Sequence, residues 1–599
     1  MLKVCSRREN FPQCARDPPD QGLRRRFAAT FRLLDSLPRL LDFVSRSSIL
    51  FPREQNCPAP HEVQSLCRTG HPSGDRVPPL HSSADVNGSD AVGRDTRRTW
   101  LVLGLILALA AALRVLSFRG YTSHDASAYS QLAHMMVSGG FKPGMMWFFP
   151  VFSVRVGLFA PVALAFRVGG VNEVTLTLYP FLLSMLGVLL AYLAARVMFG
   201  VRAGLVAACL MALIPIDARF ASQLLPDMPA AFYMNVGLLL VYAGARQEGA
   251  SRKVAFGALA GLVLFTSWLC KETVLYLLPF GGAYLLWLAI KDRRNVVLLS
   301  ACVVVAGLLV GLEGRAYHHY AGDYFLRYHA LQSNFESAGR AMTVFTVAGM
   351  ARYLQHRALA VSQVVLLNVE DFAFTLAAAL VACAYAALRR KRRFLLPALW
   401  FGWLLLLFSF GSASLRAYVP LHVWMTRFQY PMLLPAVLLI SGLASPMLAP
   451  QDHGEPGKSC RPRLFSRMLL LAYLAVVFVV TVAFGIRTGM GRRCRVEREM
   501  ARVLKPTDPL YTDGLTAAAL RFFWKYPVAD STHDFQGMAT AQIPSGAYVL
   551  VDRSELDLLC NVDRYVPPDF RDSIPATWHE LRRKDNATLY RVPPMPLSR

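Results

Sequence analysis

The chain has 599 residues, 54% of them hydrophobic, and its 64 lysine and arginine residues against 39 acidic residues give a formal charge of +25. This charge does not indicate a nucleic-acid-binding protein, because most of the basic residues lie in an N-terminal tail and in short loops between apolar runs. The 11 cysteines include no CxxC pair, so the sequence does not indicate a zinc-binding protein either.

Residues 1–98 are rich in Arg, Pro and Ser and contain no apolar run long enough to cross a membrane. The segment 23–44 mixes arginine with Phe and Leu, which is typical of a stretch that lies on an anionic membrane face, although Pro38 interrupts it. We expect 1–98 to be a disordered basic cytoplasmic tail, or upstream sequence outside the working protein.

Twelve apolar runs follow the tail, and each is a candidate membrane-spanning helix. About 20 apolar residues in a helix cross a hydrocarbon core of about 30 Å. The runs are residues 100–118, 150–168, 173–198, 203–217, 228–245, 254–269, 272–290, 295–313, 371–388, 394–411, 428–448 and 468–486.

The basic loop residues decide which runs cross, because short loops rich in Lys and Arg stay in the cytoplasm. If the tail is inside and 150–168 does not cross, the basic run 389–393 and four other basic clusters face the cytoplasm. If 150–168 crosses, all of them face outward. We therefore predict eleven spans, with 150–168 along the outer interface, in an all-α polytopic membrane domain at 99–486.

The segment after the last span, 487–599, has the composition of a small globular domain. A helix-like pattern at 515–526 and a strand-like pattern at 547–551 predict a small α/β fold. With eleven spans, this domain lies on the extracytoplasmic side.

The stretch 120–140 directly follows the first predicted span and predicts a helix that carries an acid. Asp125 falls in its first turn, and Gly139 with Gly140 ends it. Asp125 and Tyr129 are four residues apart and share one helical face. A carboxylate in a first turn also suits the helix dipole, so this pattern alone has a purely structural explanation.

Further polar residues lie at the ends of predicted spans on the same side of the membrane. They are Asp217, Arg219 and Asp227 between two spans, Lys271 between two others, His318 and His319 in a long outer loop, and Arg427 with Tyr430 at the start of a late span. Each alone fits an interface residue whose charged end reaches the headgroups. Together with Asp125 they define a polar belt, and ionisable groups at membrane depth indicate function.

Short motifs stand in a fixed order between residues 100 and 445. They are His124-Asp125 with Tyr129 and Gly140, then 170–173, 199–204, 215–229, Lys271, and Arg427 to Tyr430 before a late span. In this order and topology the chain resembles the GT-C class of glycosyltransferases. The likeness is to the protein O-mannosyltransferases (glycosyltransferase family 39) and to the bacterial enzymes that transfer aminoarabinose or galacturonic acid to lipid A.

This resemblance implies an enzyme that uses a sugar carried on polyprenyl phosphate and inverts its anomeric centre. Asp125 would be the general base for an acceptor hydroxyl on a lipid, a protein or a glycan. Fixed cations would bind the phosphate, and the remaining polar residues would bind sugar or acceptor. The implied cations are Lys271, Arg219 and Arg427, and the implied sugar- or acceptor-binding residues are His124, Tyr129, Asp227 and Tyr430. The expected location is the plasma membrane of a bacterium, with the site facing the periplasm or exterior.

Two departures from the family pattern bear on a metal ion. The family often has an Asp-Glu pair where this chain has Asp125-Ala126, and the region 146–152 lacks the metal-binding Glu of the lipid A enzymes. His318 and His319 are adjacent and diverge by about 100° on one helix, which makes joint ligation awkward. The sequence leaves the metal and any other cofactor open.

Two other function classes remain open. A multi-span transporter would also place charges at span ends, although the sequence shows no inverted repeat. An inactive membrane assembly protein is the third interpretation, because of Asp125-Ala126.

Overall fold

The computed structural model describes residues 86–122, 125–144, 150–337, 373–411, 426–448, 461–488, 494–527, 530–535, 538–552 and 574–593. The predicted tail up to residue 85, and His124, lie outside these residues. The described part begins with a helix at Val86, earlier than the apolar run at 100 suggests.

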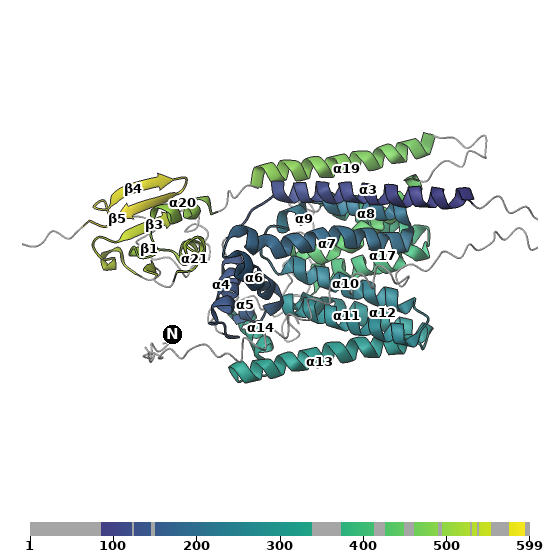
Figure 1. Ribbon diagram of the computed structural model, residues 1–599, viewed down its shortest axis with the longest axis horizontal. Coiled ribbons are helices and arrows are strands. Elements are labelled where there is room, and N and C mark those ends of the chain that lie inside the picture. The colour runs from purple at the N-terminus through teal and green to yellow at the C-terminus, as the bar shows by residue number, and fades with distance from the viewer. Residues whose placement is uncertain are drawn as a thin grey trace, which may run out of the picture. The chain divides into compact units, whose positions relative to one another are not determined.

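Helices make up most of the described chain (Figure 1). Its first half contains α3 (Val86–Leu116), α4 (Asp125–Ser138), α5 (Pro150–Ser153), α6 (Val156–Gly169), α7 (Glu173–Phe199), α8 (Val201–Leu213), α9 (Pro215–Phe220), α10 (Asp227–Ala245), α11 (Ala250–Cys270) and η2 (Glu272–Leu277). There follow α12 (Leu278–Lys291), α13 (Asn295–Ala321), α14 (Leu326–Ser337), α16 (Ala373–Leu388), η3 (Arg392–Phe394), α17 (Leu395–Phe410), η4 (Thr426–Met432), α18 (Leu433–Ala444), η5 (Ser445–Leu448) and α19 (Arg461–Thr488).

Nine of the helical segments within the described residues are long and apolar enough to cross a membrane. The shorter apolar helices α8 and α16 stand at two further predicted spans. Together they occupy the eleven predicted positions, and α6 occupies the twelfth run. The predicted class, an all-α polytopic membrane domain followed by a small α/β region, is confirmed.

The centre of the bundle is formed by α7, α8, α10 and α18. Most of α18 is buried, and α10 and α7 bury about half of their apolar stretches. In contrast, α3, α13 and α19 bury little and leave rows of leucine and valine exposed, as helices that face lipid do.

Close helix packing explains two glycines of α11. Gly257 and Gly261 are one turn apart, and a Cβ on either would lie about 2.5 Å from a carbonyl oxygen of α13. Those oxygens belong to Leu298 and Cys302. Small residues at this spacing allow two helix backbones to approach closely in a membrane.

A buried arginine fixes the break between α8 and α9, where Pro215 starts the new helix. Arg114 donates to the carbonyl oxygens of Met211 and Ala212, to Ser184 of α7 and to Asp217 of α9. It thereby satisfies carbonyls at the end of α8 that have no partner within the helix. Arg114 of α3 thereby links α3 to α7, α8 and the short α9.

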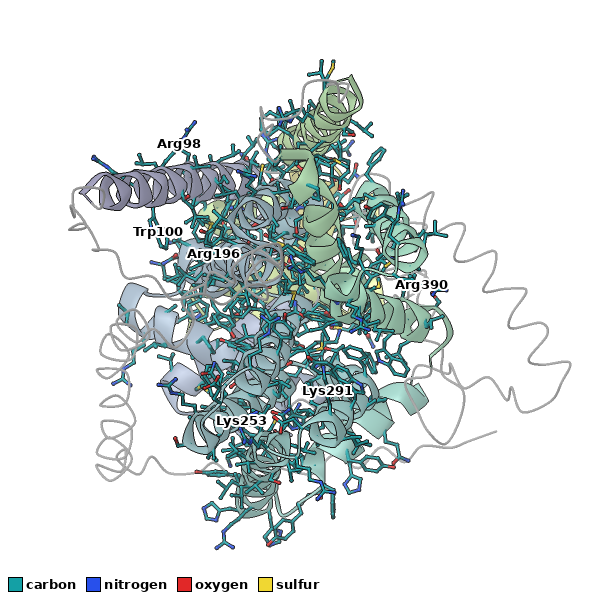
Figure 2. The ribbon with its side chains drawn as sticks, turned by 90° about the vertical axis from the view of Figure 1, so that its right-hand side faces the viewer. Arg98, Trp100, Arg196, Lys253, Lys291 and Arg390 are labelled. Carbon is teal, nitrogen blue, oxygen red and sulfur yellow. The ribbon has the colours of Figure 1, made fainter. Side chains whose placement is uncertain are left out.

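The two ends of the bundle differ. Helices α4, α5, α6 and α14 gather at one end (Figure 1). Basic residues lie at the opposite end, among them Arg196, Lys253, Lys291 and Arg390 (Figure 2). This is the separation that the loop charges predict, although the orientation in a membrane stays a prediction.

The C-terminal region contains a five-stranded sheet in the order β2-β1-β3-β5-β4. Its elements are α20 (Arg495–Val503), β1 (Leu510–Thr512), α21 (Gly514–Phe523), β2 (Thr532–Asp534), η6 (Thr540–Gln542), β3 (Tyr548–Asp552), β4 (His579–Lys584) and β5 (Ala587–Arg591). β1 pairs in parallel with β2 and β3, whereas β3, β5 and β4 are antiparallel. The predicted strand at 547–551 is β3, and the predicted helix at 515–526 is α21, which ends three residues earlier.

Candidate active site

Four residues of the predicted polar belt meet in one cluster, although they come from distant parts of the chain. Arg427 Nη1 lies 2.6 Å from Asp125 Oδ2, and Arg427 Nε lies 3.9 Å from Asp227 Oδ2. Lys271 Nζ pairs with the other carboxylate oxygen of Asp227. We call Asp125, Asp227, Lys271 and Arg427 the charge cluster.

Each member of the charge cluster stands where a helix begins or ends. Asp125 and Asp227 are the first residues of α4 and α10, where a carboxylate is stabilised by the helix dipole. Lys271 follows the last residue of α11 in an extended conformation, and Arg427 lies in η4, just before α18. Because these ends coincide in space, four separate chain breaks place their side chains together.

Exposure divides the charge cluster into a buried pair and an accessible pair. The side chains of Asp227 and Lys271 are 4% and 10% exposed, whereas those of Asp125 and Arg427 are 24% and 25% exposed. The ring of Phe428 lies 4.2 Å from Lys271 Nζ and 5.3 Å from the Arg427 guanidinium carbon. The cluster thus offers an accessible carboxylate paired with Arg427, and both of its cations lie near the ring of Phe428.

Tyr129 lies one turn after Asp125 on α4, as predicted, but it is fully buried. Its hydroxyl accepts a 2.8 Å hydrogen bond from Arg155 Nη1, and its ring packs edge-on against Phe152. Burial raises the pKa of Tyr129, so its phenol stays protonated. The structure therefore gives the Tyr129 hydroxyl a protein partner, Arg155, which sequence reasoning placed only in an interfacial run.

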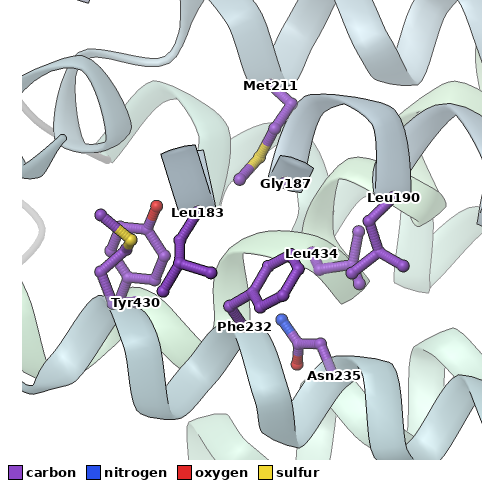
Figure 3. A pocket seen from close by; sticks show the side chains of 9 residues that line it. Leu183, Gly187, Leu190, Met211, Phe232, Asn235, Tyr430 and Leu434 are labelled. Atoms are coloured by element: carbon purple, nitrogen blue, oxygen red, sulfur yellow. The ribbon is translucent and has the colours of Figure 1, made fainter. Parts of the chain in front are cut away.

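Arg219 and Tyr430 lie in other surroundings. The Arg219 guanidinium lies over the rings of Phe220 and Phe484, between α9 and α19. Tyr430 lines a largely apolar pocket inside the bundle (Figure 3). The other lining residues are Leu183, Gly187, Leu190, Met211, Met228, Phe232, Asn235 and Leu434.

Within the described residues, no group of three or more His, Cys, Asp or Glu side chains is arranged to hold a metal ion. His318 stacks on Tyr324, with ring centroids 4.0 Å apart, and His319 packs against Tyr320. The two histidines thus lie against separate aromatic rings.

Comparison with known proteins adds a family match over part of the chain and a similar fold. Residues 158–312 match the family model described as dolichyl-phosphate-mannose-protein mannosyltransferase. The chain also shares its fold with the crystal structure of ArnT from Cupriavidus metallidurans in the apo state, at a TM-score of 0.51 and 16% sequence identity. That comparison covers 83% of this chain and 98% of ArnT. The chain thus has the fold of ArnT, and its residues 158–312 match the mannosyltransferase family model.

Two further solved structures are similar to this chain. ArnT from Cupriavidus metallidurans bound to undecaprenyl phosphate has a TM-score of 0.49 and 15% identity, and the comparison covers 83% of this chain and 98% of that one. The oligosaccharyltransferase AglB from Archaeoglobus fulgidus, in complex with an inhibitory peptide and a dolichol-phosphate, has a TM-score of 0.47 and 14% identity, over 76% of this chain and 70% of that one. No curated protein sequence matches the chain significantly.

Proposed function

We propose that this integral membrane protein transfers a sugar from a polyprenyl-phosphate donor to an acceptor hydroxyl, with inversion, and that Asp125 is the general base. The observation that carries the proposal is the charge cluster, in which the accessible carboxylate of Asp125 pairs with Arg427, and Arg427 also lies 3.9 Å from Asp227, the partner of Lys271. The matching family model is described by a lipid-phosphate-linked sugar donor, and ArnT has been solved with undecaprenyl phosphate. Both support a donor of this kind.

The proposed reaction needs a base on one side of the anomeric carbon and cations on the other. The acceptor oxygen attacks the anomeric carbon, and its proton passes to Asp125. The bond from that carbon to the phosphate oxygen breaks, and the electron pair stays on the polyprenyl phosphate. A positioned base contributes about 10²–10⁴-fold, and fixed cations stabilise the charge that develops on the leaving phosphate.

Arg427 changes partner in this scheme. Without substrate it neutralises Asp125, to which it donates a hydrogen bond. As Asp125 takes up the proton it loses its negative charge, while the phosphate gains one. The guanidinium, which can bind phosphate through two N–H groups, then interacts more strongly with the phosphate than with Asp125.

The site is proposed to face the periplasm or exterior of a bacterial plasma membrane, because the charge cluster lies at the starts of α4 and α10, away from the basic loops. A surface location gives access to lipid, protein or glycan acceptors. His124, Arg219 and Tyr430 remain proposed contributors to substrate binding, and Tyr129 contributes through its contact with Arg155.

The first prediction concerns Asp125→Asn, which keeps the shape of the side chain but cannot accept the proton. In a deletion strain, this variant should fail to restore the glycan and lipid profile, measured by mass spectrometry, with a loss of about 10²–10⁴-fold. Asp323→Asn is the control, because Asp323 caps the backbone near Phe325 and pairs with His329 at the surface. It should restore the profile fully.

Membrane levels and undecaprenyl phosphate binding, measured by native mass spectrometry, should be the same for both variants. Full restoration by Asp125→Asn would contradict the proposed base. If the deletion changed the profile and Asp125→Asn still restored it fully, an assembly role would explain the protein better.

A further inference from the structure

A second group of buried charges lies directly beside the charge cluster. Arg155, which follows α5, donates to Tyr129 of α4 and binds Glu272 of η2 in a bidentate fashion, at 2.9 and 3.3 Å. The side chains of Arg155 and Glu272 are 11% and 12% exposed. Nε and Nη2 of the Arg155 guanidinium thus bind Glu272, and Nη1 of the same planar group binds Tyr129.

Glu272 also binds a second arginine, Arg327. Arg327 of α14 lies 3.4 Å from Glu272 and 2.7 Å from Glu313 of α13. Glu313 also accepts hydrogen bonds from Trp268 and Tyr317. Glu272 is therefore held between two arginines whose positions are fixed by three helices.

The two partners of Arg155 are neighbours of two members of the charge cluster. Tyr129 lies one turn after Asp125 on α4, and Glu272 directly follows Lys271. The path Asp125–Tyr129–Arg155–Glu272–Lys271 therefore joins the carboxylate proposed as base to a cation proposed for the phosphate. Arg427 and Asp227 already connect Asp125 with Lys271 within the charge cluster, so this path is a second connection between them.

We propose that Arg155 is a positioning residue for the transfer reaction: through Tyr129 and Glu272 it fixes the distance between Asp125 and Lys271. This inference rests on the proposed function of those two residues. Arg155 acts through its neighbours and does not contact the reacting atoms. A planar fork suits this task, because its two directions of hydrogen bonding are rigidly linked, whereas a lysine would offer a single point charge.

The expected size of the effect follows from the precision that transfer reactions require. A displacement of about 1 Å between reacting groups can cost about 10²-fold in rate. Arg155→Lys keeps the positive charge against Glu272 and should lose the link to Tyr129. We expect about a 10²-fold loss of turnover, with undecaprenyl phosphate binding unchanged, because Lys271 and Arg427 are still present.

Tyr129→Phe tests the same link with less disturbance, because it removes one hydroxyl from a fully buried ring. It should lower turnover about tenfold, and combining it with Arg155→Lys should add little, because both changes break one connection. The matched control is Tyr179→Phe. Tyr179 is a part-buried tyrosine that does not belong to this path, and its hydroxyl lies 3.2 Å from Gly157 O and 3.3 Å from the Tyr233 hydroxyl.

The experiment compares product formation in the deletion strain at matched protein levels, undecaprenyl phosphate affinity by native mass spectrometry, and the Tm of the purified proteins. The proposal expects Arg155→Lys and Tyr129→Phe to lose product while affinity and Tm stay near the parental values, and Tyr179→Phe to lose none. Parental product formation in both variants would overturn it. So would a loss of product that follows a fall in Tm, since this would show a role in stability alone.

Asp125→Asn, measured in parallel, separates the two proposals. If Asp125→Asn is inactive and the Arg155 and Tyr129 variants are fully active, only the positioning role fails. If Asp125→Asn is fully active, the proposed base and the positioning role both fail.

Discussion

At the scale of single residues, the charge cluster contains two carboxylates and two cations. They differ in how much stability the protein would lose if one of them were removed. Asp227 and Lys271 are almost completely buried, so each neutralises a charge that water cannot reach. Removing one partner of a buried pair costs about 3–5 kcal/mol, because the other charge is left without compensation. Arg427 and Asp125 are more accessible, and water can replace part of their interaction.

This difference gives a prediction for Lys271. Lys271→Met should lower both the Tm and the activity, because Asp227 then keeps only the more distant Arg427, at 3.9 Å, as a cationic neighbour. Adding Asp227→Asn removes the stranded charge and should recover most of the Tm but none of the activity. Arg427→Gln, the comparison variant, should lower undecaprenyl phosphate affinity with a smaller change in Tm. A parental Tm for Lys271→Met would show that Arg427 or water compensates the charge of Asp227.

The residues of the charge cluster could be named from the sequence, but their partners could not. Asp125, Asp227, Lys271 and Arg427 each interrupt or border an apolar run, where a charge is conspicuous. Helical spacing gave the face on which Tyr129 lies, but spacing alone does not reveal which side chain meets that face. Arg155 and Glu272 looked like ordinary interface charges until the fold placed them 2.9 Å apart.

At the scale of elements, the contact between α4 and α21 is notable because α4 carries Asp125. The ring of Tyr121 stacks on Phe522 at 4.4 Å, and His134 stacks on Tyr526 at 4.6 Å. The Tyr526 hydroxyl lies 2.7 Å from Ser130 Oγ of α4. The C-terminal region thus contacts the helix that positions the proposed base.

The backbone turn that ends α21 includes Tyr526, the residue that contacts α4. The amide of Tyr526 donates to Arg521 O and that of Lys525 to Phe522 O, the pattern in which a left-handed residue closes a helix. Glycine usually takes this position, but here Lys525 and Tyr526 have φ of +62° and +53°. The absence of a glycine explains why the sequence predicted a helix up to 526, whereas α21 ends at Phe523.

We predict that Tyr526→Phe loosens α4. Losing its hydrogen bond with Ser130 should cost about 1 kcal/mol. Amide hydrogen exchange in 125–138 should therefore become about fivefold faster, which is 1 kcal/mol converted at 1.4 kcal/mol per tenfold, provided that α4 opens locally. Tyr548→Phe is the control, because Tyr548 lies in β3 and its ring faces Arg591. Unchanged exchange in 125–138 for Tyr526→Phe would show that the contact does not restrain α4.

At the scale of the whole molecule, charge and hydropathy give different predictions for one apolar run. The run at 150–168 is as apolar as a span, and only the count of basic loops indicated that it does not cross. In the structure, α6 packs on α4, α7 and α11 at the end of the bundle where α4 lies (Figure 1). Since α8, with 13 residues, stands at a predicted span, the interfacial position of α6 is favoured by its place at this end of the bundle and not by its length of 14 residues.

The same argument predicts the orientation of the chain in the membrane. The segment 389–393 holds five consecutive basic residues between α16 and α17, at the end of the bundle that also carries Arg196, Lys253 and Lys291 (Figure 2). Loops of this kind stay in the cytoplasm. An epitope tag inserted at 389–393 should therefore be protected from an impermeant reagent in intact cells, whereas a tag after residue 590 should react. Both should react after the cells are permeabilised, which controls for tags that are folded away. Labelling of the 389–393 tag in intact cells would mean that the orientation is reversed, and the charge cluster would then have to act on the cytoplasmic side.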